Sequence, residues 1–346
     1  MRTRSAGIAV ALSVAALCGA STARYDFKST LAAKLAAATA AKESVIVGSD
    51  GWLFNFDELH HLSLGTFWGD AAKAVSRATS PTAADPLPAI LDFRDQLKKA
   101  GIELVIVPVP AKASIYPEAL DSGSTNSESA RLDAADAEFI AVLKQSGVNV
   151  IDLVPPFLQF KKDHPDQLLY SKEDTHWSGY GIGIASDLVA AEVKKQDWYA
   201  GTPQAKFTTT PGAVQVTGDL VVSLTGAKPG PESVMLTAVK DAAGGPVQSS
   251  RTSPLVLLGD SHNLIYSVGE DMLAVSSGYP ENVAAKLGFA ADVVGVRGSG
   301  ATPARVNLAR RADNMAGKKM VVWTFTVREF TEGQGWRKVP VIKAAQ

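Results

Sequence analysis

The chain has 346 residues, more than one small compact domain needs, so its length predicts either one large domain with an insertion or two domains. Hydrophobic residues make up 46% and charged residues 20%, which is ordinary for a globular protein. The formal net charge is -1, and Lys and Arg form no long basic run, so the composition argues against a nucleic-acid partner.

Residues 1–23 have the features of a secretory signal peptide. Arg2 and Arg4 give a positive start, residues 8–17 form an apolar middle, and a small-x-small cleavage sequence follows. Because the apolar run is short and rich in alanine, it favours export over a permanent membrane span, and an uncleaved anchor is the alternative. The lone cysteine, Cys18, lies inside this segment, so the exported part is expected to hold no disulfide and no cysteine-ligated metal.

The chain that follows reads as alternating helices and strands. An alanine-rich helical segment is expected over residues 24–44, and a linker rich in Pro, Ala and Thr at 80–88. Apolar, β-branched runs predict buried parallel strands at 103–109, 148–153, 254–258, 292–296 and 319–325. Helical spacing predicts helices at 90–100, 127–145, 178–195, 280–287 and 303–312. The alternation predicts an α/β fold with helices on both faces of a parallel sheet, a three-layer α/β/α domain.

One stretch breaks this alternation. Residues 206–251 are rich in Thr, Val, Gly and Pro, and we expect them to form loops with short strands. We interpret them as a loop- and β-rich insertion within one domain rather than as a separate domain. That domain is expected to span residues 45–340 and to be followed by a short tail at 341–346.

Two short motifs carry the residue types of acyl-transfer chemistry. Ser261 follows a predicted strand and a glycine, which favours an exposed hydroxyl at the carboxyl edge of the sheet, where ligands bind in open α/β folds. Asp174 and His176 are two residues apart, so in an extended segment the carboxylate can orient the imidazole. A serine hydroxyl is a weak nucleophile without an adjacent base. The motifs therefore predict a Ser-His-Asp triad with Ser261 as nucleophile, His176 as base and Asp174 as orienting group.

The tetrahedral intermediate of acyl transfer also needs hydrogen-bond donors. The backbone N–H of Ser261 is one candidate. The Gly298-Ser299-Gly300 turn follows a predicted strand and can bring another donor to the same edge, so Gly298 is the second candidate for the oxyanion site.

Other interpretations of these residues stay open. Gly-Asp-Ser is also typical of turns, and Asp174 can instead cap the helix expected to begin near residue 178. Trp177 either covers the site or belongs to the core. Asp174 with His176, and Asp260 with His262, are both Asp-x-His pairs, so if they converge they can bind a divalent metal and activate water, as in a metal-dependent deacetylase.

Six blocks in order along the chain join these motifs to a known family. They are Gly48-Ser49-Asp50-Gly51-Trp52-Leu53-Phe54, Val107-Pro108-Val109-Pro110-Ala111-Lys112, Asp174-Thr175-His176-Trp177, Gly218-Asp219-Leu220, Gly259-Asp260-Ser261 and Val322-Trp323. With these blocks, the chain resembles the SGNH-hydrolase-like polysaccharide O-acetyltransferases of the AlgJ/AlgX family over roughly residues 45–330.

The resemblance implies an SGNH-hydrolase-like α/β/α fold and the same three triad roles for Ser261, His176 and Asp174. It implies an acetyl-serine intermediate, an exopolysaccharide such as alginate as acceptor, and an acetyl donor supplied by a membrane-bound O-acyltransferase. It implies a periplasmic protein, tethered to the inner membrane if the signal is not cleaved, and no cofactor or metal. We take Lys112 and Trp177 from the matching blocks as candidates for substrate binding.

The chain also departs from the family pattern. Many members have Gly-Thr-Ser followed by an aromatic residue at the nucleophile, where this chain has Gly-Asp-Ser and His262. Residues 323–329 differ from the family's usual Trp-Glu ending, so we expect no catalytic role for them. No carbohydrate-binding module follows the domain, which favours the shorter, AlgJ-like type. The alternatives are a carbohydrate acetylesterase, a metal-dependent deacetylase, and a non-catalytic assembly protein of a polysaccharide secretion complex.

Overall fold

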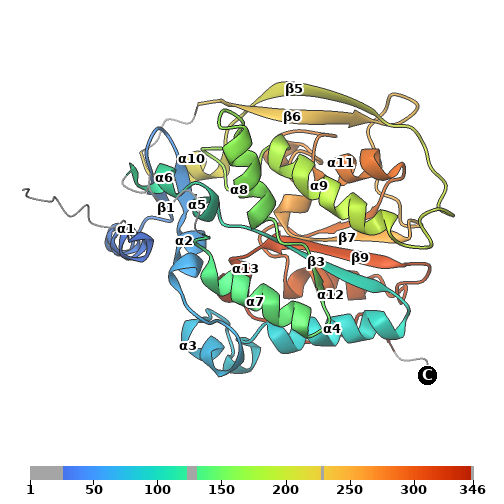
Figure 1. Ribbon diagram of the computed structural model, residues 1–346, viewed down its shortest axis with the longest axis horizontal. Helices are drawn as coiled ribbons and strands as arrows, with labels where there is room; N and C mark the ends of the chain where they lie inside the picture. Colours follow the sequence, from blue (N-terminus) through green and yellow to red (C-terminus); the bar gives the residue numbers. More distant parts are fainter. Residues whose placement is uncertain (1–25, 123–130, 227–229, 344–346) are drawn as a thin grey trace, which may run out of the picture.

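The computed structural model describes residues 26–122, 131–226 and 230–343 (Figure 1). The signal peptide expected at 1–23 lies outside the described residues. Within the three described ranges, no helix has the length and hydrophobicity that crossing a membrane requires.

A five-stranded parallel sheet forms the centre of the domain. Its strand order is β4-β3-β9-β7-β8, so the last strand of the chain lies in the middle. The strands are β3 (Glu103–Val109), β4 (Asn149–Val150), β7 (Leu255–Gly259), β8 (Asp292–Gly295) and β9 (Met320–Thr326). Every residue of β7 and β9 is buried, which explains why their sequences are continuous apolar runs.

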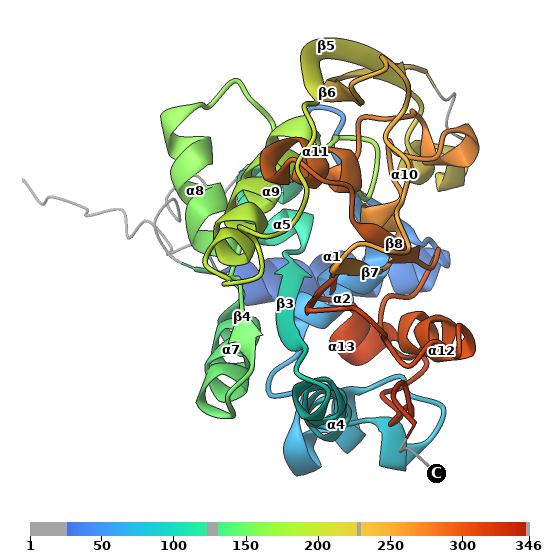
Figure 2. The same cartoon turned by 90° about the vertical axis from the view of Figure 1, so that its right-hand side faces the viewer.

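Helices cover both faces of the sheet, as Figures 1 and 2 show. One layer contains α4 (Leu87–Lys99), α7 (Ala134–Gln145), α12 (Thr302–Arg310) and the short α13 (Glu329–Glu332). The other contains α8 (Val154–Asp163), α9 (Gly179–Lys194) and α11 (Tyr279–Leu287). The predicted three-layer α/β/α fold is therefore confirmed.

The insertion forms a long antiparallel hairpin on the outside of α9 and α11 (Figure 1). Its strands are β5 (Thr208–Val216) and β6 (Glu232–Lys240), which pair over nine residues each. A short helix, α10 (Asp219–Ser223), lies between them in the chain. The expectation of short strands was wrong, because the alternation in β6 buries Val234, Leu236 and Val239 against the domain and so supports a longer strand.

The N-terminal part packs beside the sheet. Helix α1 (Phe27–Ala41) leads to a small hairpin of β1 (Val45–Val47) and β2 (Leu53–Asn55), whose turn contains the Gly-Trp block. Trp52 is buried there and its ring lies 4.6 Å from that of Tyr116. The remaining short helices are α2 (Phe56–Ser63), α3 (Ala72–Val75), α5 (Lys112–Ile115) and α6 (Pro117–Leu120).

Two sequence predictions in the middle of the chain were wrong. The strand expected at 148–153 is only the two-residue β4, because α8 begins at Val154. This helix was missed since its Pro-Pro pair reads as a breaker, whereas proline in the first turn of a helix lacks only an N–H that has no partner there. The helix expected at 127–145 begins at Ala134, and residues 127–130 lie outside the described residues.

Gly259 allows β7 to lie close to β9 at the carboxyl edge. A Cβ at this position would come 1.7 Å from Thr324 O and 2.3 Å from Asn263 Nδ2. We predict that Gly259→Ala lowers the free energy of unfolding by about 3 kcal/mol or more, measured by urea denaturation. Gly183→Ala in α9 is the control: its Cβ meets open space, so a gain of about 0.5–1 kcal/mol is expected. Equal stability of Gly259→Ala and the wild type would contradict this account.

Candidate active site

Ser261 lies two residues beyond the end of β7, at the carboxyl edge of the sheet. The preceding residue, Asp260, fixes the turn: its Oδ1 accepts the His262 N–H at 2.9 Å and its Oδ2 accepts the Thr326 N–H at 2.8 Å. A single 3-10 turn, Ser261–Asn263, follows, and the serine is partly exposed. The strand-then-turn pattern therefore puts a reachable hydroxyl at this edge.

Asp174 and His176 reach the same edge from a loop rather than from a strand. They lie between α8 and α9, and an antiparallel bridge between Tyr170 and Trp177 closes the loop at residues 171–176. Asp174 does not cap α9, because the cap is Ser178, whose hydroxyl accepts the next helical N–H but one at 3.1 Å. The carboxylate of Asp174 thus serves His176 and not the helix.

A continuous hydrogen-bonded chain joins the three side chains. His176 Nε2 lies 2.8 Å from Ser261 Oγ, and His176 Nδ1 lies 2.6 Å from Asp174 Oδ1. Asp174 Oδ1 also accepts the His176 N–H at 2.8 Å, and Oδ2 accepts the Asp219 N–H at 2.9 Å. With Nδ1–H donated to the carboxylate, Nε2 presents a lone pair to the serine hydroxyl, which is what a general base requires.

The two charged partners stabilise each other. Burial alone raises the pKa of Asp174, but the His176 charge and the hydrogen bonds to the carboxylate outweigh it, and the pKa falls well below its usual range. Burial lowers the pKa of His176, whereas the charge and hydrogen bond of Asp174, with the charges of Asp219 and Asp260, raise it overall. The imidazole can therefore take a proton from serine while the carboxylate beside it stays ionised.

A carboxylate from the insertion holds the first half of the 171–176 loop. Glu232, the first residue of β6, accepts hydrogen bonds from the Ser171 hydroxyl, from the Lys172 N–H at 2.8 Å and from the Glu173 N–H at 3.0 Å. These N–H groups are part of a loop without a strand partner, so the carboxylate supplies the acceptors that a sheet would otherwise provide.

Lys112 lies beneath the same loop and is fully buried. Its Nζ donates to the main-chain oxygens of Asp174 at 2.6 Å, Leu53 at 3.0 Å and Lys172 at 3.2 Å. Burial lowers its pKa to about 8, although the surrounding carboxylates act in the opposite direction. We expected Lys112 to bind substrate, but in the structure its amine faces the protein interior and supports the main chain of Asp174.

Trp177 is likewise buried rather than available to substrate. It has no exposed surface, and its ring lies 5.3 Å from that of His262 and 5.2 Å from that of Tyr279. Its indole N–H has no hydrogen-bond partner among the described residues. Of the two open interpretations, the core position is the one the structure has.

The two Asp-x-His pairs lie side by side but do not pool their side-chain ligands. The His176 and His262 rings are 4.8 Å apart, and His262 Nδ1 lies 3.0 Å from Asp260 Oδ1, as in a second, separate pair. Among the described residues, one acidic and histidine group has ligand atoms within 4.8 Å of one another, and it consists of Asp174, His176 and Asp219 without the second pair. The convergence that the metal hypothesis required is therefore not what the geometry provides.

The two oxyanion candidates differ in position. The Ser261 N–H has no hydrogen-bond acceptor among the described residues, so it is available to a ligand. Gly298 has φ of 79° and open space where a Cβ would lie, so it marks the tip of its turn. Gly300 lies closer to the nucleophile, since a Cβ there would come 2.9 Å from the Asp260 N.

The structure adds a buried carboxyl at this edge that we did not single out from the sequence. Glu329 follows β9, and its Oε2 accepts the Ser299 hydroxyl at 2.8 Å and the Ala301 N–H at 3.3 Å. Burial, together with the negative charge of Asp260, raises its pKa to about 7. Glu329 therefore attaches the turn of the oxyanion candidates to the end of β9.

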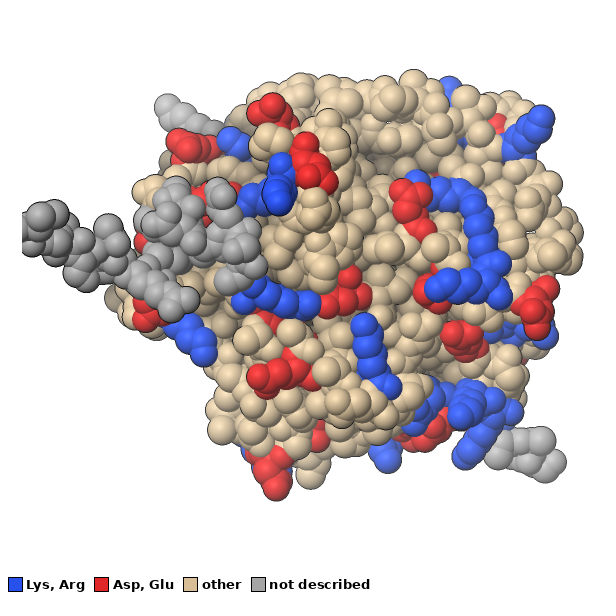
Figure 3. Space-filling view, viewed as in Figure 1, with Lys and Arg blue, Asp and Glu red and all other residues tan. Residues whose placement is uncertain are grey.

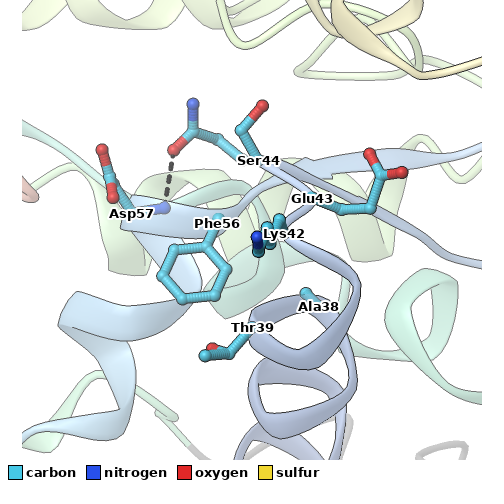
Figure 4. Close-up of a pocket in the computed structure, with 8 residues that line it drawn as sticks. Ala38, Thr39, Lys42, Glu43, Ser44, Phe56 and Asp57 are labelled. Carbon is cyan, nitrogen blue, oxygen red and sulfur yellow. Dashed lines mark hydrogen bonds between the residues drawn. The ribbon is translucent and has the colours of Figure 1, made fainter.

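Two hollows in the described part of the chain lie away from Ser261. One, of about 280 Å³, lies between the end of α1 and the start of α2, where Lys42, Phe56 and Asp57 line it (Figure 4). The other, of about 370 Å³, lies at the amino ends of β3 and β4. On the face seen in Figure 3, Lys and Arg are interspersed with Asp and Glu, so no extended single-sign patch marks a binding face there.

Residues 45–327 match the model of a protein family described as "SGNH hydrolase-like domain, acetyltransferase AlgX". The chain belongs to this family. A protein of Pseudomonas putida named "Probable alginate O-acetylase AlgJ" is 28% identical over 239 residues, which are 64% of this chain and 55% of that protein. The chain thus spans about half the length of the curated relatives it matches.

Solved structures of the family share the fold. The O-acetyltransferase domain of Pseudomonas putida AlgJ superposes with a TM-score of 0.59 at 22% identity, covering 83% of this chain and 92% of that domain. Pseudomonas aeruginosa AlgX superposes with a TM-score of 0.60 at 19% identity, covering 82% of this chain and 62% of that one. The SGNH-hydrolase-like fold expected from the sequence is therefore confirmed.

We predict that Lys112→Met destabilises the protein, because main-chain oxygens of three segments lose a buried donor. The expected loss in the free energy of unfolding is on the order of 3 kcal/mol by urea denaturation. Lys98→Met, at an exposed position of α4, should change stability little. If the two variants are equally stable, the amine does not support the loop.

We predict that Glu329→Gln stabilises the protein at high pH only. The folded carboxyl has a pKa of about 7 against an ordinary value of 4.5, so its stability is complete below 4.5 and is lost as the pH rises through 7. Glutamine removes this loss, so urea denaturation should show a gain of about 3 kcal/mol at pH 8 and little gain at pH 4. Glu138→Gln, at an exposed position of α7, is the control. A gain equal at both pH values would contradict the assignment.

Proposed function

We propose that this protein is a polysaccharide O-acetyltransferase that works through an acetyl-serine intermediate. The single observation that carries the proposal is the hydrogen-bonded chain from Ser261 through His176 to Asp174. Membership of a family described as acetyltransferases gives the reaction class, and the AlgJ and AlgX names of its relatives give the substrate class.

The first half-reaction loads the enzyme. Ser261 Oγ attacks the acetyl carbonyl of the donor while His176 Nε2 takes the hydroxyl proton. The Asp174 carboxylate stabilises the imidazolium, and the free Ser261 N–H faces the developing oxyanion. When the tetrahedral intermediate collapses, the bond to the donor's leaving group breaks, and His176 returns the proton to that group.

The second half-reaction unloads it. A sugar hydroxyl attacks the acetyl-serine carbonyl, and His176 takes the hydroxyl proton as it forms the new ester bond. Collapse of this intermediate breaks the bond to Ser261 Oγ, which recovers its proton from the imidazolium. The same base serves both halves, so the reaction needs no further titratable group.

The acceptor and donor follow from the relatives rather than from the triad. Their printed names refer to alginate, so we propose an alginate-like polyuronate as the acceptor. We propose that the signal at residues 1–23 directs the chain to the periplasm, where a membrane-bound O-acyltransferase supplies acetyl groups. Retention of the signal would keep the domain near that donor at the inner membrane.

We predict that Ser261→Ala abolishes acetyl-enzyme formation and lowers kcat by roughly 10³-fold or more. After incubation with 4-nitrophenyl acetate, the wild type should carry one acetyl group on the peptide that contains Ser261, as mass spectrometry will show. Ser233→Ala, at an exposed serine of β6, should load like the wild type. Undiminished acetylation in Ser261→Ala would refute the triad.

Adding deacetylated alginate oligosaccharides to the loaded enzyme separates transfer from hydrolysis. We expect the oligosaccharides to gain acetyl groups and the loaded enzyme to decay faster than in buffer. Release of free acetate alone, at a rate that the acceptor does not change, would assign the protein as an esterase. A wild type that never loads would leave only the assembly role.

A further inference from the structure

Asp174 depends on the insertion for one of its two carboxylate oxygens. Its Oδ1 is shared by the His176 main chain and ring, whereas its Oδ2 accepts the N–H of Asp219 at 2.9 Å. Asp219 begins α10, 45 residues farther along the chain. The orientation of the triad carboxylate is therefore set from outside its own loop.

The side chain of Asp219 makes the return contact. Its Oδ1 accepts the Thr175 N–H at 2.7 Å and its Oδ2 accepts the Thr175 hydroxyl at 2.8 Å. Thr175 is the residue between Asp174 and His176, so both oxygens of one carboxylate hold the middle of the catalytic motif. The two segments thus bind each other reciprocally, by a main-chain donor in one direction and a carboxylate in the other.

The sequence between these segments explains why they can approach so closely. Gly218 precedes Asp219, and a Cβ on it would come 2.1 Å from Glu173 O and 2.7 Å from the Asp174 N. The Leu220 and Val221 N–H groups both donate to Glu173 O at 3.2 Å. A glycine, an aspartate and two apolar residues therefore form one seat for the loop.

We propose that Asp219 is a positioning residue of the triad, so that the insertion completes the active site. This inference rests on the proposed function, because it assigns Asp219 a task in the reaction of Ser261 and His176. Asp219 itself is exposed, and its carboxylate lies within 4.8 Å of the ligand atoms of Asp174 and His176. It therefore acts on the imidazole through charge as well as through the loop.

The charged and titratable groups around His176 come from several elements. Asp174 is in its own loop, Asp219 begins α10, and Asp260 with His262 follows β7. Lys112 of α5 lies behind Asp174, and Glu232 of β6 and the buried Tyr266 lie near the same carboxylates. The negative charge of Asp219 is one of those that raise the pKa of His176, so its removal has a defined sign.

The test compares Asp219→Asn with Asp219→Ala. Asparagine keeps the shape and one acceptor for Thr175 but loses the charge, so the pKa of His176 falls and the acid limb of kcat/KM moves to lower pH. Alanine also frees Thr175, so kcat should fall further, roughly 10²-fold, with little change in KM. Asp241→Asn is the matched control, since Asp241 lies in the same insertion and accepts the main-chain N–H groups of Ala243 and Gly245.

A second measurement does not need activity. The imidazole of His176 is titrated by NMR in the full chain, which has 5 histidines, and its signal is identified by its loss in His176→Asn. A lower titration midpoint in Asp219→Asn, and none in Asp241→Asn, supports the proposal. An unchanged midpoint in Asp219→Asn, or an equal shift in the control, overturns it.

Failure of the proposed function has a different signature. In that case wild-type Ser261 carries no acetyl group, whatever the state of residue 219. The histidine titration still decides the role of Asp219, because it reads the imidazole and not the serine. If Asp219→Ala does not fold, the isosteric Asp219→Asn decides alone.

Discussion

The 171–176 loop is the part of the molecule on which the site depends, and it is held by charged side chains instead of by a strand. Glu232 and Asp219 accept its N–H groups, and Lys112 donates to its carbonyls. Main-chain groups this deeply placed must have partners, and charge-assisted hydrogen bonds are the strong way to supply them. Three segments far apart in the chain therefore meet at one six-residue stretch.

The sheet supplies the other half of the site. β9 is the last strand in the chain but the central one in the sheet, and it fixes β3 on one side and β7 on the other. Because all five strands are parallel, their carboxyl ends share one edge, and the nucleophile follows one of them directly. Gly259, which would clash with β9 if it carried a side chain, sets how close that edge can be.

Much of the architecture could be predicted because its signals are local. The buried strands are continuous apolar runs, and the helices have 3.6-residue periodicity with recognisable caps such as Ser178, so five of the expected elements agree with the structure to within a few residues. The failures have local causes too. A Pro-Pro pair at the start of α8 looks like a helix breaker, and the alternation in β6 is weak because one face of that hairpin is exposed.

The sequence by itself determined the fold class and the three residues of the proposed triad, because a serine after a strand and an Asp-x-His motif are both short-range patterns. Only the tertiary structure decided what surrounds them. Lys112 and Trp177 read as substrate contacts but are buried, and Asp219 had a motif without a role. The physical reason is that hydrogen bonds across 45 or 62 residues leave no periodicity in a sequence, since they depend on where the chain returns and not on how it begins.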